Sequence, residues 1–336
     1  MPVERSYVFP ELHAGMDHDH YDWSPLNATR APLEWPGNAR VALCVIVTLE
    51  HMEWSRPPNS YQIPNLAGGY GQGPFPDVTA WSHREYGHRV GIFRLLKVLD
   101  KYGVKPTIAM DVLTAEHYPF LVRHCLGRGD EIIGHGISVN RMITSRMSEQ
   151  EELEYIRTSV QALTRATGTA PVGWLGPESG ESTRTPQLLA QLGIRYVCDW
   201  VNDEQPYAFT VPQGELYALP IALPIDDVNA LWDRRIDIDR YREMIKETFE
   251  TLYGEGATNG RLLVLHLHPW LMGQGCRCST SRRPFVAPSS YSVAKVSLII
   301  SLYLSISIRR SQRALTSSTG SAMGRAYSSP WGTFKG

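Results

Sequence analysis

The chain has 336 residues, of which 43% are hydrophobic and 20% are charged, a composition typical of a globular protein. The formal net charge of −1 gives no basic excess, which argues against nucleic acid or a membrane as a partner. The five cysteines are an odd number in a long chain, so a disulfide framework is not expected. The first residues include no apolar core, so we expect no secretory signal and a cytoplasmic location.

Residues 1–39 show no periodicity, and we interpret them as an extended N-terminal arm. From residue 40 onward, apolar strands alternate with amphipathic helices. The predicted strands are Val41–Leu49, Pro106–Met110, Glu131–Gly134, Val172–Leu175, Arg195–Cys198, Leu216–Leu223 and Arg261–Leu267. The predicted helices are Glu85–Tyr102, Ala115–Leu126, Ser148–Ala166, Thr185–Leu192 and Ile238–Tyr253. A loop over 53–84, rich in glycine, proline and aromatic residues, is predicted to form a packed lid.

This order of strands and helices predicts an α/β fold with a parallel sheet and helices outside it. Seven strands fit a (β/α) barrel better than an open doubly wound sheet. No glycine-rich phosphate turn follows the first strand, which argues against a dinucleotide-binding fold and a dehydrogenase.

The composition changes after Gly275. Residues 276–336 are rich in serine and arginine and contain no aspartate or glutamate. We interpret them as an atypical tail, disordered or produced by a frameshift or retained intron, with a genuine basic extension as the alternative. The barrel over 40–275 would then lack its native last strand–helix unit. An open barrel edge predicts poor solubility or a homo-oligomer.

Polar side chains follow several of the predicted strands. Glu50 and His51 follow the first strand, and His135 follows the third. The fifth strand leads into Asp199 and Asp203, and the last carries His266 and His268. Because the carboxyl ends of parallel barrel strands meet at one face, we expect these groups to form one site.

Five segments in this order resemble the polysaccharide deacetylase (NodB-homology) family, and most closely its branch of metal-independent allantoinases and cyclic imide hydrolases. The resemblance covers about residues 35–275 and implies a distorted (β/α)7-type barrel that hydrolyses a non-peptide C–N bond. The segments are Thr48-Leu-Glu-His51, Gly134-His-Gly-Ile-Ser138, Gly173-Trp-Leu-Gly-Pro-Glu178, Asp199-Trp-Val-Asn-Asp-Glu-Gln-Pro-Tyr207 and Leu267-His-Pro269 followed by Gly273-Gln274.

The sequence departs from the metal-dependent members of this family. Those members carry an Asp-Asp pair after the first strand and a His-Ser/Thr-x-x-His motif after the third. This chain has Glu50-His51 at the first motif, and Val139 where the second histidine is expected. The cofactor is therefore either none or a zinc-type divalent metal held by His135, His51 and Glu50.

The positions of these residues suggest roles in amide hydrolysis. Glu50 fits the general base, and His268 fits the general acid that protonates the leaving nitrogen. Asp199 or Asp203 is expected to orient His268. His135 would polarise the carbonyl, directly or through a metal.

Further residues are assigned by their places near these motifs. Of the two histidines on the last strand, we expect only His268 to face the site and assign His266 to packing. The candidate substrate contacts are Arg89, Trp174, Pro177 and Trp200.

We expect a hydrolase of small cyclic amides, ureides or imides, because the predicted lid suits a closed pocket. An N-acetyl-sugar deacetylase, which needs an open groove for a polymer, is one alternative. A degenerate, non-catalytic barrel used for binding is another, since Val139 and Leu175 stand at two expected polar positions.

Overall fold

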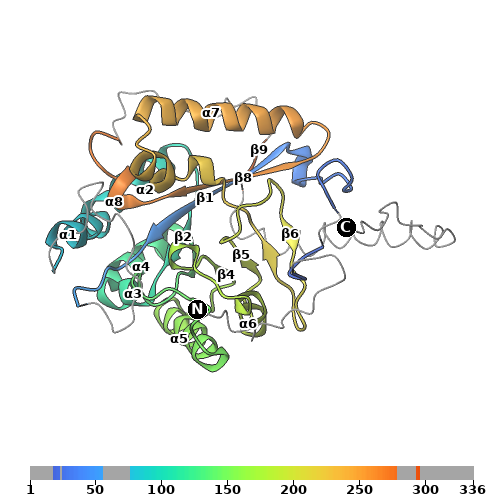
Figure 1. The fold of residues 1–336 in the computed structure, drawn as a ribbon. Coiled ribbons are helices and arrows are strands. Elements are labelled where there is room, and N and C mark those ends of the chain that lie inside the picture. The colour runs from blue at the N-terminus through green and yellow to red at the C-terminus, as the bar shows by residue number, and fades with distance from the viewer. Residues whose placement is uncertain (1–17, 23–24, 56–75, 278–292, 296–336) are drawn as a thin grey trace, which may run out of the picture.

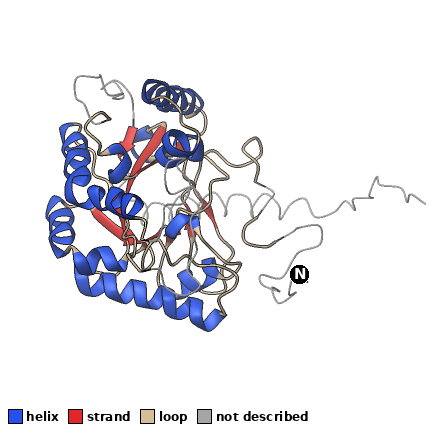
Figure 2. Cartoon of the chain, turned by 60° about the vertical axis from the view of Figure 1, so that its left-hand side comes forward, coloured by secondary structure: helices blue, strands red, loops and turns tan. Residues whose placement is uncertain are grey.

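The computed structural model describes residues 18–22, 25–55, 76–277 and 293–295 (Figure 1). A curled sheet forms the centre, and helices surround its outer face (Figure 2). This arrangement confirms the expected α/β barrel architecture. No helix within these described ranges is long and apolar enough to cross a membrane.

The strands of the sheet follow the order β6-β7-β5-β4-β3-β2-β1-β8, with β9 pairing with β1. All neighbouring pairs are parallel except β6 and β7. The strands are β1 (Val41–Leu49), β2 (Thr107–Met110), β3 (Glu131–Gly134), β4 (Gly173–Trp174), β5 (Tyr196–Val197), β6 (Tyr207–Ala208), β7 (Tyr217–Ala218), β8 (Arg261–Leu267) and β9 (Val293–Lys295).

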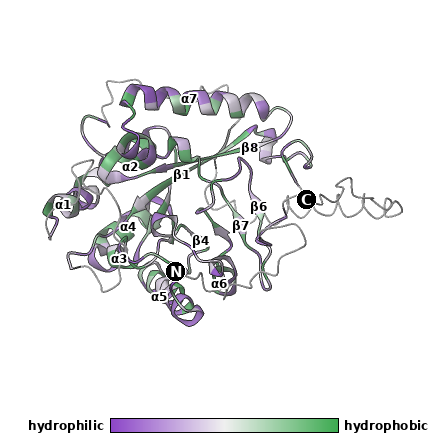
Figure 3. Cartoon of the chain, in the orientation of Figure 1, coloured by the Kyte–Doolittle hydropathy of each residue, from purple (hydrophilic) through white to green (hydrophobic). Residues whose placement is uncertain are grey.

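The helices cover the sheet with their apolar sides. Helix α5 begins at a capping box formed by Ser148 and Glu151. Helix α7 alternates apolar and polar residues along its length, which suits packing against β8 on one side only (Figure 3). The helices are α1 (Val78–Tyr86), α2 (Ile92–Lys101), α3 (Val112–His117), α4 (Pro119–Arg128), α5 (Glu149–Thr167), α6 (Thr185–Gln191), α7 (Ile238–Glu255) and α8 (Pro269–Met272).

The side chains of β1 alternate between two apolar clusters, and this alternation defines the inside of the barrel. Ala42, Cys44 and Ile46 belong to the inner cluster, together with Leu262 and Val264 of β8. The intervening residues of β1, by contrast, pack against the helices. Because side chains two residues apart share a face, the inner face continues through the even-numbered positions towards the carboxyl ends of both strands.

Loop segments supply hydrogen bonds to the outer edge of β8. The backbone N–H of Leu262 donates to the carbonyl of Glu204, and the N–H of Ala222 donates to the carbonyl of Val264. The indole N–H of Trp35, from the N-terminal arm, donates to the carbonyl of Arg261 at 2.8 Å. These contacts satisfy part of an edge that would otherwise expose unpaired backbone groups.

Two local expectations differ from the structure. Helix α1 already begins at Val78, where Asp77 caps it, so the loop predicted over 53–84 extended too far. Residues 56–75 of that loop lie outside the described residues. The single helix predicted over Ala115–Leu126 is two helices, because the chain turns at Tyr118 and Pro119 starts a new one.

The C-terminal tail lies mostly outside the described residues, so its origin and the domain boundaries stay predictions. Within it, β9 runs parallel to β1, with Val293 opposite Val41.

The backbone of Gly173 in β4 lies close against the aromatic ring of Tyr196 on the neighbouring strand β5. A Cβ atom at Gly173 would lie 2.2 Å from the Tyr196 ring. We predict that Gly173→Ala lowers the free energy of unfolding by about 1–3 kcal/mol, since the packed ring must move. Exposed Gly127 in α4 has no atom within 4 Å of such a Cβ, so Gly127→Ala should stabilise by about 0.5–1 kcal/mol. Urea denaturation of both variants checks the difference, and an equal effect would contradict it.

Candidate active site

Glu50 directly follows β1 and lies at the centre of a buried group of polar side chains. One carboxylate oxygen, Oε1, pairs with the Arg84 guanidinium and accepts a hydrogen bond from Trp270 Nε1 at 3.2 Å. The other oxygen, Oε2, lies 3.6 Å from His135 Nε2. These contacts join β1, α1, α8 and the end of β3, so Glu50 and His135 share one site as the sequence predicts.

His135 presents an unprotonated nitrogen to Glu50. Its Nδ1 lies 2.6 Å from the carbonyl oxygen of Leu175, which can only accept, so Nδ1 carries the hydrogen. Burial lowers the pKa of His135, and the Asp111 carboxyl offsets this only in part, so the ring is neutral at pH 7. Its Nε2 has no hydrogen-bond partner. Two hydrogen-bond acceptors therefore face each other across 3.6 Å.

Arg84 supplies the buried positive charge of this site. Its Nη2 lies 3.7 Å from Glu178 Oε1, and its guanidinium carbon lies 5.2 Å from the centre of the Trp270 ring. Burial lowers the pKa of Arg84, whereas the Glu178 and Asp111 carboxyls raise it, and the net direction is downward. Glu178 adopts a φ of 53°, a strained conformation that accompanies its position beside the guanidinium.

Arg84, and not the predicted Arg89, pairs with Glu50 in the structure. Arg89 is exposed on a π-helical stretch, Gly87–Gly91, and its role in binding stays a prediction. The expected helix began at Glu85, so Arg84 was assigned to the loop before it. A helix beginning at Asp77 would have placed Arg84 in its last turn.

Glycines let the helix that carries Arg84 pack closely on α8. A Cβ atom at Gly91 would lie 2.1 Å from the Pro269 carbonyl oxygen, and one at Gly87 would lie 2.9 Å from the Trp270 backbone nitrogen. On the α8 side, a Cβ at Gly273 would lie 2.3 Å from Gly91 Cα. These glycines form a tight seam between the π-helical stretch and α8.

His268 is oriented by Asp227. Its Nδ1 lies 2.7 Å from Asp227 Oδ1, and its backbone N–H donates to Asp227 Oδ2 at 2.7 Å. Burial lowers the pKa of His268, but the Asp227 carboxylate outweighs it and the net pKa is raised. The expectation that Asp199 or Asp203 orients His268 was wrong, because Asp227 from the loop after β7 holds this position.

His266 also faces the inside of the barrel, so its assignment to packing alone was wrong. His266 and His268 are two residues apart and share a face, and their ring centres lie 4.4 Å apart. His266 Nδ1 lies 2.8 Å from Asp226 Oδ2, and its Nε2 hydrogen-bonds to the Thr48 hydroxyl. Two neighbouring Asp–His pairs therefore stand at the end of β8.

Asp199 and Glu181 are neighbouring carboxyl side chains that form a second polar group beside the site. Asp199 Oδ1 accepts a hydrogen bond from the Gly176 N–H at 2.7 Å. Burial raises the pKa of Glu181, and the neighbouring Asp199 carboxyl raises it further. Burial raises the pKa of Asp199 to about 6, although hydrogen bonds to its carboxyl and the nearby His135 lower it. The Trp200 indole donates to Glu181 at 3.0 Å.

The other predicted substrate contacts lie around this second group. Trp174 is fully buried in the core, Pro177 is buried next to Gly136, and the Trp200 ring packs on Tyr21 and Phe209. Their contact with substrate stays a prediction.

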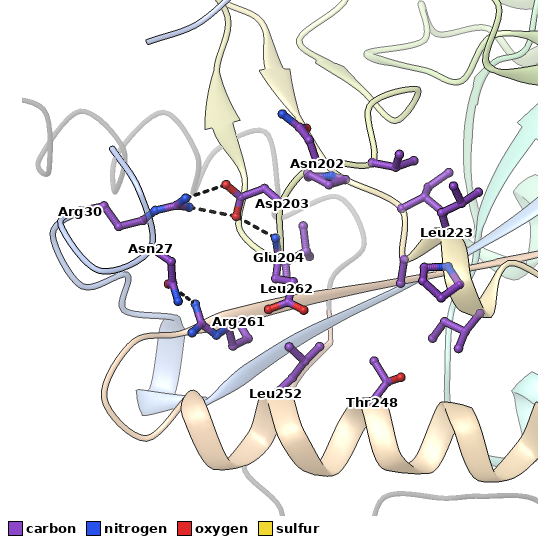
Figure 4. A pocket seen from close by; sticks show the side chains of 16 residues that line it. Asn27, Arg30, Asn202, Asp203, Glu204, Leu223, Thr248, Leu252, Arg261 and Leu262 are labelled. Atoms are coloured by element: carbon purple, nitrogen blue, oxygen red, sulfur yellow. Dashed lines mark hydrogen bonds and ion pairs between the residues drawn. The ribbon is translucent and has the colours of Figure 1, made fainter. Parts of the chain in front are cut away.

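Asp203 lies apart from the group around Glu50. It forms a two-point ion pair with Arg30, with distances of 2.7 and 2.9 Å (Figure 4). Asp203 lines a cavity of about 550 Å³ between β8, α7 and the loops at 201–204 and 220–225. None of the residues that line this cavity is Glu50, His135 or His268.

The residues expected to hold a metal do not come together as three ligands. The His51 ring packs against His117 with ring centres 4.8 Å apart, and Val139 is buried in an apolar cluster with Met52 and Ala80. Glu50 and His135 remain, and the Arg84 cation already pairs with Glu50. We therefore find that this position does not fit a three-ligand zinc site. In the described part of the chain, Asp226, His266 and His268 are close enough to share an ion.

Comparison with known proteins supports a single family. Residues 82–197 match the family model described as polysaccharide deacetylase. A Schizosaccharomyces pombe protein assigned as a polysaccharide deacetylase is 26% identical over 264 residues, which is 71% of this chain and 82% of that protein. The chain is therefore similar to the polysaccharide deacetylase family over residues 82–197. Members of this family hydrolyse amide C–N bonds, as the sequence predicts for this chain.

Two solved structures show how much of the fold this chain shares with known proteins. Puue allantoinase has a TM-score of 0.72 and 25% identity, covering 84% of this chain and 97% of that one. A probable polysaccharide deacetylase from Pseudomonas aeruginosa PAO1 has the same TM-score and identity, covering 84% and 98%. The expected barrel is thus confirmed over most of the chain.

Asp227 should control the protonation of His268 in this protein. We predict that Asp227→Asn lowers the pKa of His268, because the substitution removes the carboxylate that stabilises the imidazolium. NMR titration of the imidazole signals measures this pKa. Asp203→Asn is the matched control and should leave it unchanged, since Asp203 pairs with Arg30. An equal decrease in both variants would contradict the assignment.

Proposed function

We propose that the protein hydrolyses the amide C–N bond of a small cyclic amide, ureide or imide. The observation that carries this proposal is the pair of acceptors formed by Glu50 Oε2 and His135 Nε2, which are 3.6 Å apart. Neither atom has a hydrogen to donate, so a molecule with two donors would bridge them from one side. Water meets this requirement and is the nucleophile of amide hydrolysis.

In the proposed reaction, Glu50 is the general base. As the water oxygen attacks the carbonyl carbon, one water proton passes to Glu50 Oε2, and the other hydrogen bonds to His135 Nε2. The Arg84 ion pair and the Trp270 N–H hold Oε1 in place, which leaves Oε2 to receive the proton. His135 therefore positions the water as an acceptor, in place of the polarising role expected from its sequence position.

Arg84 is proposed to stabilise the oxyanion that forms when water adds to the carbonyl. A guanidinium carries five N–H donors, and the Glu50 contact uses only part of them. The group is buried, so its charge is screened less than it would be in water. His268 then gives its proton to the leaving nitrogen as the C–N bond breaks, and Asp227 stabilises its charged form.

The burial of the site favours a small substrate. The exposed fractions of Glu50, His135 and His268 are 4%, 2% and 8%, and a polymer would need these groups along an open groove. The likeness to Puue allantoinase over most of both chains supports the same choice. The alternative substrate, an N-acetyl sugar, is favoured by the S. pombe relative. A cytoplasmic location suits a small-molecule hydrolase and, like assembly into a homo-oligomer, stays a prediction.

Substrate turnover tests the proposal directly. We expect hydrolysis of allantoin, hydantoin or succinimide, with little turnover of N-acetylglucosamine oligomers. Glu50→Gln and His268→Ala should each lower kcat by about 10²–10⁴-fold, because each removes a proton-transfer group. Glu53→Gln is the matched control, since Glu53 pairs with Arg141 and should not be needed. Turnover of the oligomers alone would favour the sugar alternative.

The pH dependence of kcat/KM follows from the raised pKa of His268. The general acid must be protonated, so activity should fall as the pH rises through this raised pKa. Asp227→Asn should move this alkaline limb to lower pH in addition to lowering the rate. A limb that stays in place in this variant would contradict the role of His268 as the acid.

A further inference from the structure

Asp226, His266 and His268 bring three metal-ligand atoms together at the end of β8. One atom from each residue lies within 4.8 Å of the other two, and all three residues are buried. Two imidazoles and one carboxylate are a donor set that suits a zinc-type divalent ion. These residues come from β8 and the loop after β7, whereas the family resemblance implies ligands after the first and third strands.

The surrounding contacts hold this cluster in a fixed arrangement. Asp226 Oδ1 accepts a hydrogen bond from the Asn229 N–H at 2.8 Å, and the Thr48 hydroxyl hydrogen-bonds to His266 Nε2. The third residue, His268, is held by the hydrogen bond between its Nδ1 and Asp227 Oδ1. Such outer hydrogen bonds orient metal ligands and strengthen binding.

The charge balance of the cluster also favours a cation. Two carboxylates, Asp226 and Asp227, stand beside two imidazoles, and each carboxylate is within 2.8 Å of one ring nitrogen. Arg84 is the basic side chain whose charge lowers the pKa of His268, and it is itself paired with Glu50. An added divalent ion would replace the hydrogen between Asp226 and His266 and would leave the hydrogen bond between Asp227 and His268 in place.

We propose that Asp226, His266 and His268 bind a zinc-type divalent ion that inhibits the enzyme. His268 cannot coordinate the ion and also deliver a proton to the leaving nitrogen. The ion would therefore block the reaction at the acid, instead of activating water at Glu50. The inhibition rests on the proposed role of His268, whereas the binding does not.

Zinc binding to the full chain tests the site itself. After treatment with chelator, calorimetry with Zn²⁺ should show one site whose affinity falls by at least about tenfold in Asp226→Asn and in His266→Gln. His51→Gln is the matched control and should keep the affinity, because His51 packs on His117. Unchanged binding in the first two variants would overturn the site.

A measurement on the unmodified chain guards against variants that do not fold. Paramagnetic Co²⁺ should broaden or shift the imidazole NMR signals of His266 and His268 while leaving those of His124 unaffected. His124 lies on α4, where it packs between Phe93 and Phe120. Signals of His266 and His268 that stay unchanged at saturating Co²⁺ would overturn the site.

Activity then tests the inhibition. With a substrate that the chain turns over, saturating Zn²⁺ should lower the rate at least about tenfold, and EDTA should restore it. The ratio of rates with and without Zn²⁺ should approach one in Asp226→Asn. Activation by Zn²⁺ would overturn the inference and leave the proposed function standing. Absence of turnover of every amide would instead contradict the proposed function, and the binding experiments would still decide the site.

Discussion

The parallel pairing of β1 with β8 is the constraint on which the rest of the structure depends. Seven residues of each strand are in register, from Val41 opposite Arg261 to Val47 opposite Leu267. This register puts even-numbered residues of both strands on the inner face of the barrel. In the first part of each strand these residues, such as Cys44 and Val264, are apolar. The same alternation places the polar residues that follow, Glu50 and His268, at the same end of the barrel.

Electrostatics then decides what this end of the barrel can do. A carboxylate and a neutral imidazole nitrogen face each other, and a buried guanidinium holds the carboxylate from the other side. An isolated buried charge is strongly unfavourable, so Glu50 and Arg84 stabilise each other in the ionised state. The ion pair thus places a fixed positive charge where metal-dependent relatives are expected to hold an ion.

The strands were predictable from the sequence because their apolar runs are continuous. Val41–Leu49 and Arg261–Leu267 agree with β1 and β8 at both ends. Strand β6 has only two residues, too few to show an alternation of apolar and polar side chains. The start of α1 at Val78 was missed because its capping residue, Asp77, follows a stretch rich in glycine and proline.

The candidate site could be predicted only in part. Glu50, His135 and His268 follow strand ends and were found for that reason. Asp227 comes after a two-residue strand and a loop, and no local pattern connects it with His268. Arg84 reaches Glu50 through the packing of one helix on another, which a single sequence does not reveal. The assignment of His266 to packing was wrong because residues two apart on a strand share a face, so His266 and His268 point to the same side.

The glycine seam between the π-helical stretch and α8 has a consequence for motion. Backbone atoms of Gly91 and Pro269 are in direct contact, with no side chains between them that could rearrange. The segments that carry Arg84 and Trp270 therefore cannot shift past each other without a backbone clash. The two groups that contact Glu50 Oε1 thus keep a spacing that is set by the backbone itself.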